Sequence, residues 1–166
     1  MHEVQAKGIL SAQNGMNLYR GCTHGCIYCD SRSTCYQMNH DFEDIEVKKN
    51  AVELLEQTLK NKRKKCMIGT GSMCDPYMHI EEELGHTRQC LELIERYGFG
   101  VAIQTKSARI LRDLDVIKRI NEKTKAVVRM AQKFCKENGI VFDVERCFSY
   151  LHEFEEKETF EQMSLF

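Results

Sequence analysis

Apolar residues follow two alternating patterns along the first three quarters of this chain. Short apolar runs predict four strands, at residues 16–20, 66–69, 101–103 and 125–128. Longer segments with apolar residues three or four positions apart predict helices at residues 47–59, 84–97 and 110–121. Strands that alternate with helices pair in parallel through right-handed crossovers, so the pattern predicts an α/β fold with about three to four parallel strands.

The two ends of the chain depart from this alternation. Residues 1–14 show no clear period, and we expect them to form an N-terminal arm before a core at residues 15–128. Two further helical patterns, at residues 130–137 and 144–154, predict a C-terminal helical segment over residues 129–154. Residues 153–161 are rich in acidic side chains, which predicts that residues 155–166 form a flexible, exposed tail.

Composition narrows the class of protein. A chain of 166 residues can bury one sizeable core, and its net charge of −1 creates no global attraction for nucleic acid. No apolar run approaches the length of a membrane span, and residues 1–4 lack a signal-peptide pattern, so we expect a cytoplasmic protein without membrane contact.

The nine cysteines could suit a disulfide scaffold, but such scaffolds are short and rich in loops, whereas this chain carries long helical patterns. We therefore expect reduced thiols.

Three of these thiols are close together in a C-x3-C-x2-C pattern formed by Cys22, Cys26 and Cys29. Thiolates are the usual ligands of iron-sulfur clusters, and three of them on a four-iron cluster leave one iron open to a substrate or cofactor. Two alternatives use the same residues. A structural zinc site would need a fourth ligand, which Cys35 or His24 could supply, and a C-x2-C pair could act as a redox dithiol.

The sequence around these cysteines resembles the radical S-adenosylmethionine (SAM) superfamily. The resemblance is carried by residues 15–32, by residues 69–77 and by residues 105–107, and it is closest to the branch related to spore photoproduct lyase. It implies a partial (β/α) barrel in which the three cysteines hold a [4Fe-4S] cluster. The open iron would bind the amino and carboxylate groups of SAM. One electron, from a donor such as flavodoxin or ferredoxin, would then cleave SAM to a 5′-deoxyadenosyl radical.

The resemblance also assigns expected roles to residues beyond the cluster ligands. Tyr28 would pack on adenine, unless it is an ordinary loop aromatic, and Lys106 would contact SAM, unless it is a solvated lysine. The remaining SAM contacts implied by the resemblance are Gly69, Gly71, Ser72, Cys74 and Asp75. Ser72 aligns with the hydrogen-donating cysteine of the lyases and Cys74 lies two residues away, so both are catalytic candidates. This departure argues against lyase activity on thymine photoproducts.

The proposed barrel is shorter than the resemblance requires. About six strand-helix units of roughly 30 residues need far more chain than residues 16–128 supply. We therefore interpret the chain as an internally shortened member of the family, whose activity the missing half-barrel could impair. Its fourth strand would expose a sheet edge, which the C-terminal helices or a second copy in a homodimer would cover.

The last five residues resemble the short peptide by which bacterial repair and replication proteins bind the sliding clamp. Gln162, Leu165 and Phe166 would make the contacts, or the two apolar residues would fold back on the last helix. The sequence thus favours a radical SAM enzyme, with a possible link to DNA repair or nucleic-acid chemistry. The alternative function is a non-catalytic zinc or redox metal-binding module.

Overall fold

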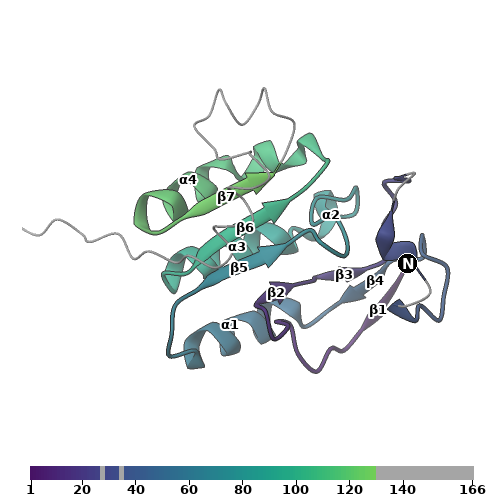
Figure 1. Ribbon diagram of the computed structural model, residues 1–166, viewed down its shortest axis with the longest axis horizontal. Coiled ribbons are helices and arrows are strands. Elements are labelled where there is room, and N and C mark those ends of the chain that lie inside the picture. The colour runs from purple at the N-terminus through teal and green to yellow at the C-terminus, as the bar shows by residue number, and fades with distance from the viewer. Residues whose placement is uncertain (27–28, 34–35, 130–166) are drawn as a thin grey trace, which may run out of the picture.

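The computed structural model describes residues 1–26, 29–33 and 36–129 (Figure 1). Its centre is a four-stranded sheet in the order β2-β5-β6-β7, and every neighbouring pair in it is parallel. The strands are β2 (Gly15–Met16), β5 (Met67–Thr70), β6 (Gly100–Gln104) and β7 (Ala126–Arg129). The expected α/β fold with a parallel sheet is therefore confirmed for this part of the chain.

Three helices form one layer against this sheet. They are α1 (Ala51–Asn61), α3 (His86–Arg96) and α4 (Leu114–Lys123), and α3 packs between the other two (Figure 1). Each helix buries the apolar stripe that its sequence period indicates: the fully buried side chains include Leu55, Leu91, Ile94, Val116 and Ile120. Shorter helical turns at α2 (Glu81–Leu84), Asp30–Arg32 and Ala108–Asp113 complete the described helical elements.

A second, smaller sheet forms at the N-terminal side and corrects three of the expectations. It contains β1 (His2–Val4), β4 (Glu46–Lys48) and β3 (Tyr19–Arg20) in the order β1-β4-β3. The expected arm at residues 1–14 therefore includes a paired strand. The expected helix start at Val47 is wrong, because Val47 pairs with Glu3 and Tyr19 in this sheet and the helix begins at Ala51. The expected strand at residues 16–20 is divided between the two sheets.

A buried carboxylate joins the smaller sheet to two helical elements. Glu81 is fully buried, and its side chain accepts hydrogen bonds from the Tyr19 hydroxyl, from the Thr87 backbone N–H at 2.8 Å and from Arg112 Nη2 at 3.1 Å. Burial and the neighbouring Glu81 charge both raise the pKa of Tyr19, so the phenol stays protonated and donates. Because these donors come from three separate elements, Glu81 fixes how β3, α3 and the turn before α4 meet.

Several expectations concern residues outside the described ranges. Among them are Tyr28, Cys35, the helical segment at residues 130–154 and the tail with Gln162, Leu165 and Phe166. Since β7 is the last described strand and residues 130–166 follow it, the shortened barrel and the homodimer stay predictions. In the described part of the chain, no helix combines the length and the apolar composition needed to cross a bilayer.

Replacement of Glu81 should destabilise the fold. We expect Glu81→Ala to lower the free energy of unfolding by about 3 kcal/mol, because it leaves the buried Tyr19 hydroxyl and the Thr87 N–H without their acceptor. It also removes one of the two carboxylates that Arg112 contacts. Chemical denaturation measures the loss. The matched control is Glu83→Ala in the same short helix, where the side chain is exposed and a change within about 0.5 kcal/mol is expected. Equal effects of the two substitutions would contradict the assignment.

Candidate functional site

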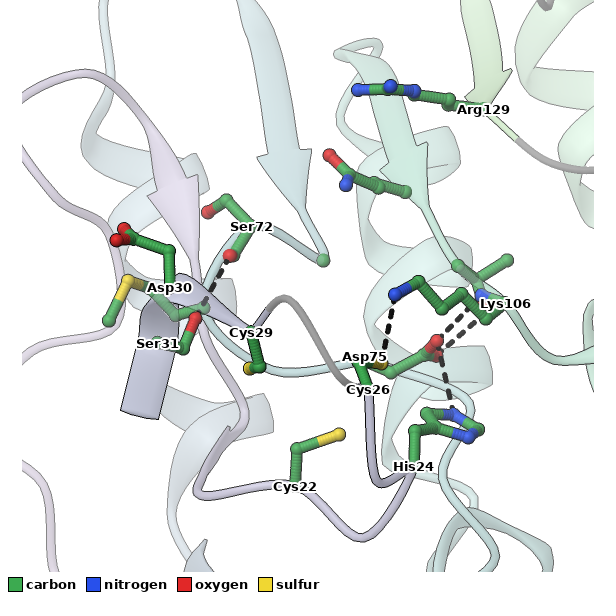
Figure 2. A pocket seen from close by; sticks show the side chains of 14 residues that line it. Cys22, His24, Cys26, Cys29, Asp30, Ser31, Ser72, Asp75, Lys106 and Arg129 are labelled. Atoms are coloured by element: carbon green, nitrogen blue, oxygen red, sulfur yellow. Dashed lines mark hydrogen bonds and ion pairs between the residues drawn. The ribbon is translucent and has the colours of Figure 1, made fainter. Parts of the chain in front are cut away.

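A cleft of about 570 Å³ opens beyond the carboxyl ends of β5, β6 and β7 (Figure 2). This is the edge at which parallel α/β sheets carry their chemistry, because loops from neighbouring strands converge there. The three sequence blocks singled out above all contribute side chains to it. Its lining consists of Cys22, His24, Cys26, Cys29, Asp30, Ser31, Gly71, Ser72, Met73, Asp75, Gln104, Thr105, Lys106 and Arg129.

All three cysteines of the C-x3-C-x2-C pattern line this one cleft, and their thiols are free (Figure 2). The loop that carries them is held at its start. Gly21 has a φ of +87°, and a Cβ there would collide with the Phe42 carbonyl oxygen. The same carbonyl accepts a hydrogen bond from the Cys22 N–H at 3.0 Å. Position 21 therefore requires glycine, because any side chain there would prevent the backbone from lying this close to Phe42.

A cation lies against one of the sulfurs. Lys106 Nζ donates to Cys26 Sγ at 2.8 Å (Figure 2). This hydrogen bond raises the pKa of the Lys106 ammonium, with smaller contributions from the charges of Cys29 and Asp75. A positive charge therefore lies within hydrogen-bond distance of one of the three cysteine sulfurs.

Asp75 holds the parts of the cleft together. Its Oδ1 accepts from Thr105 Oγ1 at 2.7 Å and from the Tyr77 N–H at 2.8 Å. Its Oδ2 accepts from the Lys106 N–H at 2.7 Å and lies 3.2 Å from Nε2 of His24 (Figure 2). The carboxylate is only 8% exposed, so these contacts compensate its burial. The cysteine loop, the segment after β5 and the end of β6 are thereby joined at one side chain.

The segment after β5 approaches β6 very closely. Gly71 has a φ of +97°, and a Cβ there would collide with the carbonyl oxygen of Gln104, so this position requires glycine. Ser72 follows it on the cleft surface, and its carbonyl accepts from Ser31 Oγ at 3.5 Å (Figure 2). The structure thus brings Gly71, Ser72, Asp75 and Lys106 to the cysteines, as the sequence blocks suggested.

Two expected site residues lie elsewhere. Cys74 is buried in the core, where Sγ donates to the Tyr19 carbonyl at 3.0 Å, and desolvation raises the pKa of this thiol to about 12. It does not line the cleft. Gly69 lies within β5 and lines a neighbouring cavity of about 260 Å³. The placement of Tyr28 is outside the described residues. Of the two catalytic candidates, Ser72 therefore faces the cleft and Cys74 does not.

Sequence reasoning missed two polar residues at the strand ends. Gln104 and Arg129 are register partners at the ends of β6 and β7, and both line the cleft. The expectation that a helical segment begins at residue 129 is wrong, because Arg129 is the last residue of β7. The signal was available, because each is the first polar residue after an apolar strand and carboxyl ends of parallel strands share one edge.

The donor set and the space fit a cluster better than a lone zinc ion. A structural zinc ion needs four ligands at about 2.0–2.3 Å and no adjoining space. Here three thiols border a cleft within the usual size range for small-molecule sites, with polar side chains around it. His24, the possible fourth zinc ligand, lies with Nε2 toward Asp75, and Cys35 is outside the described ranges. The residues therefore fit a cluster with a second ligand beside it.

Comparison with known proteins agrees with this geometry. An uncharacterised protein of Methanocaldococcus jannaschii is 34% identical over 115 residues, which cover 68% of this chain and 42% of that protein. Uncharacterised proteins of Mycobacterium bovis and Mycobacterium tuberculosis are 28% identical over 125 residues, which cover 70% of this chain and 36% of theirs. The chain thus spans less than half the length of these relatives. No solved structure is significantly similar to it. The sequence model of the Radical SAM superfamily matches residues 16–134, and the chain therefore belongs to that superfamily.

Proposed function

We propose that this chain binds a [4Fe-4S] cluster through Cys22, Cys26 and Cys29 and binds SAM in the adjoining cleft. The bound cluster would supply the electron that cleaves SAM reductively to methionine and a 5′-deoxyadenosyl radical. The observation that carries the proposal is the convergence of three free thiols on one cleft of about 570 Å³ at the carboxyl edge of a parallel sheet.

The polar residues around the thiols have distinct roles in this proposal. Lys106 donates its ammonium hydrogens to Sγ of Cys26 and to an anionic group of SAM. Arg129 can pair with a carboxylate in two parallel hydrogen bonds, which an ammonium cannot do. Gly71 lines the cleft, and its lack of a side chain lets the segment after β5 lie against the end of β6. Asp75 acts indirectly, by holding the segments that carry these groups.

The finer assignment rests on the resemblance to the spore photoproduct lyase branch. We propose a reaction in DNA repair or nucleic-acid chemistry, with a substrate that would enter the cleft beside Ser72. A serine has no thiol hydrogen to return to a substrate radical, so the hydrogen-donating step of the lyases is not part of the proposal. The matched region covers less than half of each relative. We therefore propose substrate contacts only for the residues that line this cleft.

Partners follow from the same chemistry. Reductive cleavage needs a one-electron donor, and a flavodoxin or ferredoxin in the cytoplasm would supply it. A homodimer would cover the sheet edge after β7.

Binding of Gln162, Leu165 and Phe166 to a sliding clamp would bring the protein to DNA without a basic surface. Titration of a peptide of residues 162–166 against purified clamp tests this; binding unchanged by Leu165→Ala with Phe166→Ala would contradict it.

Loss of any one cluster thiol should abolish cluster binding. We expect Cys22→Ala, Cys26→Ala and Cys29→Ala each to reduce the iron content after anaerobic reconstitution from four per chain to near zero, and to abolish 5′-deoxyadenosine formation. Cys35→Ala should retain both. Cys66→Ala is the matched control, because Cys66 does not line the cleft. If Cys35→Ala also removed the metal, or if the wild-type chain held one zinc ion and cleaved no SAM, the zinc-module alternative would replace this proposal.

Removal of the Lys106 ammonium should weaken SAM binding while the cluster stays bound. We expect Lys106→Ala to raise the dissociation constant of SAM about tenfold, the effect of losing one charge-assisted hydrogen bond. Equilibrium binding to the reconstituted protein measures the change, with iron content determined on the same samples. Lys118→Ala on the exposed side of α4 serves as the control. Unchanged SAM affinity would show that the Lys106 ammonium contacts the Cys26 sulfur and not SAM.

A further inference from the structure

A second group of metal-ligating side chains lies on the smaller sheet, apart from the three cysteines. One ligand atom from each of His2, His40 and Glu46 lies within 4.8 Å of the other two. His2 and Glu46 are register partners on the parallel strands β1 and β4, and His40 comes from the segment that leads into β4. The rings of His2 and His40 meet edge to face, with centroids 4.9 Å apart.

The hydrogen bonds of both imidazoles leave the same ring nitrogen available. Nδ1 of His40 lies 3.0 Å from the carbonyl oxygen of Asp41, which can only accept, so Nδ1 carries the hydrogen. Nδ1 of His2 lies 3.0 Å from a carboxylate oxygen of Asp44, which again accepts. In a neutral ring the other nitrogen, Nε2, then presents a lone pair. Donation of one ring N–H to a carboxylate or backbone carbonyl is the usual support of a metal-binding histidine.

The environment of His40 Nε2 suits a bound cation. This atom is buried, makes no hydrogen bond within the described part of the chain, and lies 3.7 Å from Oε2 of Glu46. A cation bound between these two acceptors would offset the repulsion between them. Two basic side chains that line the same cavity as Glu46 donate to backbone carbonyls: Lys48 Nζ to that of Asn17 at 2.7 Å, and Arg20 Nη2 to that of Tyr36 at 2.8 Å.

We propose that His2, His40 and Glu46 bind a divalent metal ion of the zinc class, separate from the cluster. Two imidazole nitrogens and one carboxylate are a donor set that zinc accepts, with a water molecule in the fourth position. Asp44 acts as a positioning residue, because its carboxylate orients the His2 ring. The assignment does not depend on the proposed SAM chemistry.

The site would brace the cysteine loop. His40 belongs to the same segment as Phe42, whose carbonyl accepts from the Cys22 N–H at 3.0 Å, and as Tyr36, whose carbonyl accepts from Arg20. A metal ion that joins His40 to β1 and β4 therefore fixes the segment on which the first cluster cysteine rests. Its role is structural, so metal binding and cluster assembly can be measured separately.

The experiment uses the untagged chain of residues 1–166, in which Cys22→Ser, Cys26→Ser and Cys29→Ser remove the cluster thiols. Titration with Co²⁺, followed by its visible absorption, and competition with Zn²⁺ should reveal one site per chain without sulfur-to-metal charge transfer. In the same background, His40→Gln and Glu46→Gln should each weaken binding at least tenfold. Asp44→Asn should weaken it about 10- to 100-fold, because the His2 ring loses the carboxylate that orients it. His79→Gln is the matched control, since His79 also lies beside a carboxylate, 3.2 Å from Glu82, and should change nothing.

The outcomes separate the alternatives. Circular dichroism and thermal unfolding establish that each variant is folded, and Zn²⁺ should raise the unfolding temperature of the parent but not of the His40→Gln protein. Absence of stoichiometric binding by the folded parent would overturn the proposal. Binding that survives both His40→Gln and Glu46→Gln, or that His79→Gln reduces equally, would overturn it in favour of adventitious surface binding.

Discussion

The candidate site depends on the contacts that the buried carboxylate of Asp75 makes with the surrounding segments. A carboxyl group at 8% exposure is stable only when polar partners surround it. Hydrogen-bond donors come from the segment after β5 and the end of β6, and His24 of the cysteine loop lies 3.2 Å away. The same interaction that satisfies one charge therefore positions three separate stretches of chain. Lys106 shows the consequence, since its backbone N–H is held by Asp75 while its ammonium reaches Cys26.

The parallel sheet explains why these stretches meet at one edge. Strands β5, β6 and β7 run in the same direction, so their carboxyl ends, with Gly71, Gln104 and Arg129, open onto the same cleft. The smaller sheet completes the arrangement, because β3 leads directly into the cysteine loop and the segment before β4 supports the start of that loop. Rigid elements thus surround a loop that, by its spacing, could hold a cluster.

The sequence predicted local features well and long-range ones poorly. Helices α3 and α4 and strands β5 and β6 were expected because their apolar periods depend only on neighbouring residues. Strands β1 and β4 were missed, since three residues carry too little period and their pairing joins His2 to Glu46 across the whole N-terminal region. Spacing indicated that the three cysteines could converge. It could not indicate that Cys74 turns toward the Tyr19 carbonyl, or that Asp75 joins the segments, because both depend on tertiary packing.

The central claim is that one cleft holds a [4Fe-4S] cluster on three cysteines, with SAM on its open iron. The most direct test is electron paramagnetic resonance of the reconstituted, reduced protein, with SAM carrying ¹⁷O in its carboxylate. The account predicts a four-iron signal that changes when SAM is added and a hyperfine coupling from the labelled oxygen. A four-iron signal unaffected by saturating SAM, or no four-iron signal in a folded protein with all three cysteines intact, would contradict it.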